Sequence, residues 1–188
     1  MNTPVLSYGR AQLRVGENNR FGLLGDESLK ISSVPIMVAH LTNVVALAAG
    51  SLHTCALRAD STVYCWGHNV FGRLGNGSRE DSARPVMAAG IAMATAIGAG
   101  GAFTCALLKD GQVWCWGSNG AGQLGNNTRE DSLEPVRASG LSMAARQVAV
   151  GYDFACALIG EKSVSCWGSN IFSDPKRSRF FSEIIEIK

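Results

Sequence analysis

The chain has 188 residues, 46% of them hydrophobic and 17% charged, which excludes a disordered protein and predicts a folded domain with its own core. A net charge of +2 excludes the strongly basic surface of a nucleic-acid-binding protein, so we expect no nucleic-acid partner. No apolar run reaches about 18 residues, so we expect no membrane insertion. The N-terminal residues also lack the charged start and apolar centre of a signal peptide.

Residues 1–15 are predicted to form an incomplete first strand region, and a repeat follows over residues 16–172. Segment 69–75 has one counterpart 50 residues earlier, at 19–25, and another 50 residues later, at 119–125. Three prolines keep the same spacing, at Pro35, Pro85 and Pro135, and the third unit is longer by one residue, inserted before Gly151. Together with 22 glycines, these short units predict an all-β, turn-rich fold.

One hairpin occurs three times, at residues 54–67, 104–117 and 155–168. In the second copy two apolar runs flank Asp110-Gly111, a strong signal for a tight turn between antiparallel strands. A three-residue turn centred on Asp110 places Cys105 opposite Cys115. The same register applies to the other two copies.

All six cysteines lie in these hairpins and form three pairs: Cys55 with Cys65, Cys105 with Cys115, and Cys156 with Cys166. Opposite residues on antiparallel strands lie about 4.5–5.5 Å apart, within reach of a disulfide. We expect one cross-strand disulfide per hairpin, which favours a secreted or cell-surface protein. The alternative is that the cysteines stay reduced as small buried side chains in a cytoplasmic protein.

Each unit is predicted to contain four short strands, at 86–89, 94–98, 103–107 and 112–116 in the second unit. Both faces of the hairpin 104–117 are largely apolar. A sheet with one solvent-exposed face would instead alternate apolar and polar residues along each strand. The sheet should therefore be covered on both sides. Four-stranded sheets that recur about every 50 residues and stack on one another are the blades of a β-propeller.

The motifs within the units resemble those of the regulator-of-chromosome-condensation (RCC1-type) repeat family, with paired cysteines similar to those of bacterial members. The resemblance rests on segment 50–57 (Gly-Ser-Leu-His-Thr-Cys-Ala-Leu), the Asp110-Gly111 turn, the loop 122–125 (Gly-Gln-Leu-Gly), and a Trp-Gly pair that begins at Trp66, Trp116 and Trp167. It implies a seven-bladed propeller. At about 50 residues per blade this chain supplies an open arc of three to four blades, with a non-repeat tail at 173–188.

An open arc leaves an uncovered blade face at each end, which favours association. We therefore expect either that the sequence is a fragment of a longer protein or that two chains complete one ring.

Residues shared by all units are explained by the fold, so Trp66, Trp116 and Trp167 are predicted to pack between blades. His53 occupies the slot of Phe103 and Phe154, which indicates an aromatic filler. The sequence shows no catalytic or metal-ligating constellation, and we expect neither a metal nor a cofactor. Glu80-Asp81 and Glu130-Asp131 are interpreted as solvated loops with local salt bridges, rather than as calcium ligands.

Binding is expected where the units differ. The candidate partner-binding loops are Ser51-Leu52, Gly101-Ala102 and Tyr152-Asp153, followed by 68–70, 118–120 and 169–171. Tyr152 is an aromatic of the type enriched in interface hot spots, although it could instead pack on its own blade.

The first functional hypothesis is a non-catalytic module that binds a protein partner. The resemblance implies a second, guanine-nucleotide exchange on a small GTPase of the Ran type. A third hypothesis is an exported bacterial surface or adhesion protein.

Overall fold

The computed structural model describes residues 19–169 and contains eleven strands and no helix in that range. No described segment is therefore a helix able to cross a membrane. The all-β prediction is confirmed. The strand region predicted at 1–15 and the tail at 173–188 lie outside the described residues.

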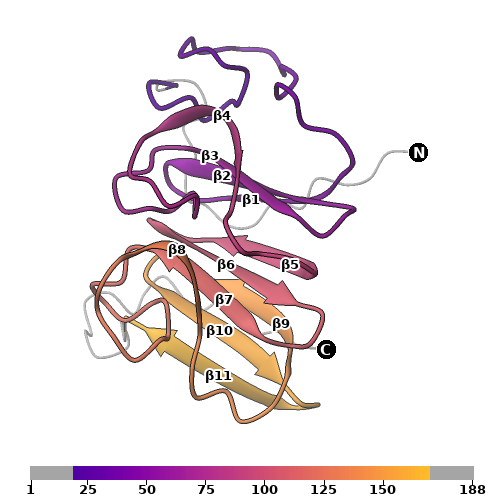
Figure 1. Cartoon of the computed structure of the whole chain (residues 1–188), viewed down its shortest axis with the longest axis vertical. Helices are drawn as coiled ribbons and strands as arrows, with labels where there is room; N and C mark the ends of the chain where they lie inside the picture. The colour runs from indigo at the N-terminus through magenta and orange to yellow at the C-terminus, as the bar shows by residue number, and fades with distance from the viewer. Residues whose placement is uncertain (1–18, 170–188) are drawn as a thin grey trace.

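The strands form three antiparallel sheets that follow one another as successive blades of an open arc (Figure 1). The first blade has the order β1 (Val44–Ala49), β2 (His53–Arg58), β3 (Val63–Gly67), β4 (Ser82–Met87). The second blade has the order β5 (Ala94–Ala99), β6 (Phe103–Leu108), β7 (Val113–Gly117), β8 (Ser132–Arg137). The third blade, within the described residues, has β9 (Ala145–Val150), β10 (Phe154–Ile159) and β11 (Ser163–Gly168).

The strand that contains the repeated proline was assigned wrongly from the sequence. It was expected after the proline, at 86–89, as the first strand of a unit. Instead β4 begins at Ser82, includes Pro85 and pairs with β3, so it is the fourth strand of the preceding blade. A proline lacks the N–H that a central strand must donate, and an outer strand tolerates that loss. The same holds for Pro135 in β8.

The hairpin register is confirmed. Cys105 lies directly opposite Cys115, and the equivalent pairs are opposite each other in the first and third blades. All three pairs form disulfides, with Cα–Cα distances of 4.1, 4.1 and 4.0 Å along the chain. Each blade is therefore crosslinked across the two strands of its hairpin.

The second blade is covered on both faces, as its two apolar faces predicted. The face with Phe103, Cys105 and Leu107 packs against alanines of the third blade. The opposite face, with Ala106 and Trp116, packs against the first blade. Two apolar interfaces between blades thus make up the core.

The loop that joins one unit to the next is held by a buried asparagine. Asn119 is fully buried, and its Oδ1 accepts the backbone N–H of Leu124 at 3.0 Å. Asp131 accepts the backbone N–H of Asn119 at 2.8 Å, and Asp81 does the same for Asn69 at 2.6 Å. The two aspartates therefore close loops through hydrogen bonds to the backbone.

Each repeated tryptophan binds the Gly-x-Leu-Gly loop that precedes it by 43 or 44 residues in the chain. The indole N–H groups of Trp66, Trp116 and Trp167 donate to the carbonyl oxygens of residues 23, 73 and 123, at 2.8, 2.9 and 3.0 Å. Gly75 lies against the Trp116 ring, with a φ of 73°, and a Cβ there would lie 2.7 Å from the indole nitrogen. The glycine of the Gly-x-Leu-Gly loop is thus required by its contact with the tryptophan.

Candidate protein-binding loops

The three loops singled out from the sequence lie in one row at one end of the strands. They connect β1 to β2, β5 to β6 and β9 to β10. The backbone N–H of Ser51 donates to the carbonyl of Gly100 at 3.2 Å, and that of Gly101 donates to the carbonyl of Tyr152 at 2.9 Å. Loops from three consecutive blades are therefore joined by backbone hydrogen bonds.

The second set of candidate loops lies against the first. Leu52 accepts the backbone N–H of His68 at 2.8 Å, Ala102 that of Ser118 at 2.9 Å, and Asp153 that of Ser169 at 2.8 Å. We call the loop row residues 51–52, 68–71, 101–102, 118–121, 152–153 and 169, which adds Phe71 and Ala121 to the predicted loops. Residues 170 and 171 of the last predicted loop lie outside the described residues.

Tyr152 is the most prominent side chain of the loop row, with 68% of its surface exposed. Its ring does not pack only on its own blade, because it lies over Gly101 of the second blade. A Cβ at position 101 would lie 2.9 Å from Cε2 of the Tyr152 ring. Gly101 itself is buried, and it lies against the tyrosine ring. Among the other predicted residues Ser51 is exposed, and the half-buried ones are Leu52, Ala102 and Asp153.

Sequence reasoning named His68, in the loop 68–70, but missed the aromatic and basic side chains beside it. The ring centroids of Phe21 and His68 lie 4.2 Å apart, and the guanidinium of Arg20 lies 4.5 Å from the Phe21 centroid. The Arg73 guanidinium lies 5.6 Å from the centroid of Phe71, which is itself exposed. A signal was present in the sequence, because Phe21 and Phe71 share a slot that holds alanine in the third unit.

Arg73 is a buried residue that supports the loop row through a hydrogen bond. It is 3% exposed, and its Nη1 donates to the carbonyl of Gly101 at 3.3 Å. Burial lowers the pKa of Arg73, while the nearby Asp81 carboxylate acts in the opposite direction. The backbone carbonyl of Arg73 also accepts bonds from Thr104 and Trp116, at 3.0 and 2.9 Å. This one residue therefore connects the first blade's loop to the second blade.

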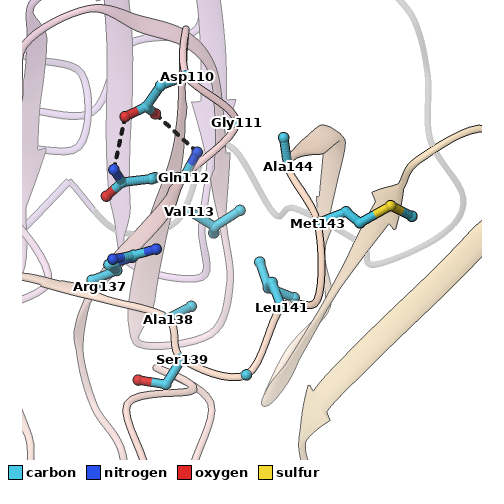
Figure 2. Close-up of a pocket in the computed structure, with 11 residues that line it drawn as sticks. Asp110, Gly111, Gln112, Val113, Arg137, Ala138, Ser139, Leu141, Met143 and Ala144 are labelled. Atoms are coloured by element: carbon cyan, nitrogen blue, oxygen red, sulfur yellow. Dashed lines mark hydrogen bonds between the residues drawn. The ribbon is translucent and has the colours of Figure 1, made fainter.

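A separate hollow lies at the opposite end of the strands, beside the β6–β7 turn (Figure 2). It has a volume of about 600 Å³ and lies between residues 110–113 and the crossover 137–144 that leads to β9. The extra residue of the third unit is accommodated in this crossover, since β5 and β9 start 51 residues apart at Ala94 and Ala145.

Two polar residues of the hollow, Asp110 and Gln112, bind each other. Asp110 accepts both the backbone N–H and the side-chain amide of Gln112, at 3.0 and 2.8 Å. Within residues 19–169, no three His, Cys, Asp or Glu side chains come together as a metal site. We therefore place the candidate site at the loop row and not in this hollow.

The comparisons with known proteins agree with this architecture. The regulator of chromosome condensation (RCC1) repeat matches residues 60–107 and 110–158, together more than half of the chain, and a second description of the same repeat matches 44–73 and 94–123. The chain belongs to the RCC1 repeat family. The search of curated proteins gave no match.

Solved structures of this type resemble the chain over most of its length. Human WBSCR16 is 25% identical, with a TM-score of 0.69, over 80% of this chain and 41% of its own. Prp20p from Saccharomyces cerevisiae is 25% identical, with a TM-score of 0.68, over 78% of this chain and 36% of its own. The chain thus spans about two-fifths or less of these proteins, which agrees with an open, partial propeller.

Proposed function

We propose that the chain is a non-catalytic protein-binding module and that the loop row contacts the partner. The observation that carries this proposal is the backbone bonding of loops from three consecutive blades, with Tyr152 and Phe71 exposed on them. Tyrosine supplies a large contact area at a low cost in conformational entropy. A surface already held by hydrogen bonds loses little further freedom when it binds.

The relatives support a protein partner in general terms. Prp20p has been described with its binding to Gsp1p and histones, and also as a complex with Kap60. These partners belong to Prp20p. For the present chain they support a protein partner as a class and leave its identity to experiment.

Site-specific crosslinking tests which face binds. A photoreactive amino acid is placed at Tyr152 in one variant and at Met143 in another, and each is irradiated in an extract of the source cells. Both side chains are more than half exposed, but Met143 lies on the crossover at the opposite end of the strands (Figure 2). A defined protein crosslinked from position 152 and not from position 143 would support the proposal. The reverse pattern would contradict it.

Exchange on a small GTPase is the second candidate, because the chain belongs to the RCC1 repeat family and resembles Prp20p, which binds Gsp1p. It is tested by the rate of nucleotide release from a panel of small GTPases. Acceleration at substoichiometric amounts of this chain would favour exchange over passive binding.

The third candidate, an exported surface protein, is favoured by the three disulfides, which persist in oxidising compartments. Fractionation of the source cells, with thiol trapping at lysis, tests it. Recovery on the cell surface with paired cysteines would support this candidate, and recovery in the cytoplasm with free thiols would contradict it.

A further inference from the structure

The backbone and the side chain of Arg73 make different contacts. Its backbone carbonyl accepts the indole N–H of Trp116 at 2.9 Å. In the same slot of the other two units, the carbonyls of Leu23 and Gln123 accept the corresponding tryptophan N–H at 2.8 and 3.0 Å. The bond between loop and tryptophan is therefore made by the backbone in every unit, and it does not depend on an arginine side chain.

The side chain of Arg73 bonds a loop of the following blade. Its Nη1 donates to the carbonyl of Gly101, in the β5–β6 loop, at 3.3 Å. Gln123, which holds the same slot 50 residues later, is also buried, but its Oε1 accepts the backbone N–H of Ala121 at 2.9 Å. Gln123 thus bonds its own loop, whereas Arg73 bonds the next blade.

Arg73 also connects the two exposed aromatic side chains of the loop row. Its guanidinium lies 5.6 Å from the centroid of the Phe71 ring. Gly101, which it bonds, donates its own N–H to the carbonyl of Tyr152 at 2.9 Å and lies against the tyrosine ring. Phe71 lies between β3 and β4, and Tyr152 lies between β9 and β10. Their relative position therefore depends on contacts between blades, and Arg73 supplies one.

This arrangement buries a positive charge with incomplete hydrogen bonding. Arg73 is 3% exposed, its Nη1 bonds a neutral carbonyl, and its Nε is buried with no hydrogen-bond partner among the described residues. Burying such a charge is unfavourable, and its replacement by a neutral side chain is often neutral or stabilising. Leucine and glutamine serve in this slot in the other units. The stability of the fold therefore does not explain the arginine.

We propose that Arg73 is a positioning residue of the loop row, whose guanidinium holds Gly101, and through it Tyr152, in the arrangement that the protein partner contacts. The inference rests on the proposed function of the loop row. Because Arg73 is buried, it acts through these two residues and does not itself touch the partner.

Hydrogen exchange tests the positioning without a partner. The N–H of Gly101 bonds Tyr152 and the N–H of Ser51 bonds Gly100, so both amides report on the β5–β6 loop. In Arg73→Gln both should exchange about tenfold or more faster than in the wild type, while the amides of β6 and the melting temperature stay unchanged. Unchanged exchange at Gly101 would overturn the proposal. Faster exchange throughout β6 would also overturn it, because it would show that Arg73 serves the fold.

Two further variants make this result specific. Arg73→Leu, with the residue of the first unit, removes every side-chain donor and should behave as Arg73→Gln does. Arg58→Gln is the matched control, because Arg58 also bonds a backbone carbonyl, that of Thr42 at 3.1 Å, and also lies 5.6 Å from an aromatic centroid, that of Tyr64. Arg58 ends β2, at the opposite end of the strands from the loop row. Faster exchange of the Gly101 amide in this control would contradict a specific role for Arg73.

The affinity for the protein crosslinked from position 152 tests the consequence for binding. Arg73→Gln should weaken it by about fivefold or more, and Arg58→Gln should leave it unchanged. In a Tyr152→Ala chain, Arg73→Gln should cost much less, because Arg73 acts through the tyrosine. Additive losses would contradict the proposal. If position 152 crosslinks no protein, the proposed function of the loop row is wrong, and the exchange rates still decide whether Arg73 positions Gly101.

Discussion

The Nε2 atom of His53 lies 2.8 Å from the Oγ1 atom of Thr104, across the boundary between the first and second blades. Thr104 donates its only hydroxyl proton to the carbonyl of Arg73 at 3.0 Å, so it accepts the Nε2–H of His53. This fixes the neutral tautomer of the imidazole. The other ring nitrogen, Nδ1, is buried without a hydrogen-bond partner in the structure.

The burial of His53 predicts a loss of stability in acid. Burial, with smaller contributions from the charges of Arg73 and His68, lowers the pKa of His53 from 6.5 to about 3. The unfolded chain therefore binds a proton between pH 6.5 and about 3 that the folded chain does not. Below pH 6.5 the free energy of unfolding should fall by up to about 1.4 kcal/mol per pH unit from this residue.

Urea denaturation of the wild type and His53→Phe between pH 7 and pH 4 measures this contribution. Phenylalanine is the residue of the same slot in the other two blades, so it fills the volume without titrating. The variant should show the shallower dependence on pH. Equal slopes for the two proteins would contradict the assignment.

Thr104→Val should destabilise the fold by about 1–3 kcal/mol, because it leaves His53 and the carbonyl of Arg73 each without one partner. Thr54→Val is the matched control, since Thr54 holds the same slot in the first hairpin with a single, longer bond of 3.4 Å to Leu23. The free energy of unfolding of both variants, from urea melts at pH 7, checks the difference. A control that costs as much as Thr104→Val would refute the argument.

Gly75→Ala should be more destabilising than Gly140→Ala. Both glycines have positive φ, 73° and 77°, so an alanine pays a similar backbone cost of about 1–2 kcal/mol at either position. Only at position 75 would the new Cβ also collide with the Trp116 ring, whereas nothing lies within 4 Å at position 140. Thermal melts of the two variants compare these costs. If both variants lose the same thermal stability, the contact between Gly75 and Trp116 does not contribute to the stability of the fold.

The third disulfide should be reduced before the other two. Cys166 is exposed, whereas Cys55, Cys65, Cys105 and Cys115 are fully buried. Peptide mapping after brief treatment with a reductant, at low protein concentration, should find the label on Cys156 and Cys166 first. Non-reduced maps should show the three pairs and no free thiol, and any other pairing would contradict the register.

Much of the fold could be predicted because its signals are local and repeated. Asp110-Gly111 sets the turn, and the turn sets Cys105 opposite Cys115. The pairing of β4, the strand that contains Pro85, could not be predicted. The sequence of residues 82–87 alone does not determine whether they pair with the hairpin before them or with the hairpin after them. Pairing with β3 is a tertiary contact.

The candidate site was predictable only in part. Differences between units identified the positions of Tyr152 and its neighbours, but the bonds that join them link residues about 50 positions apart. His53 was expected to fill space, and it does so while also bonding to Thr104, 51 residues away. Arg73 stands where the other units have leucine or glutamine, and its support of Gly101 depends on the stacking of the blades.

The affinity for the protein captured by crosslinking, measured for four forms of the chain, is the most direct test of the loop row as a binding surface. These are the wild type, Tyr152→Ala, Phe71→Ala and the control Met143→Ala. Both loop-row variants should weaken binding by about tenfold or more, which corresponds to at least about 1.4 kcal/mol, and the control should bind as the wild type does. If Met143→Ala weakens binding and the loop-row variants do not, the partner binds elsewhere and the proposed function of the loop row is wrong.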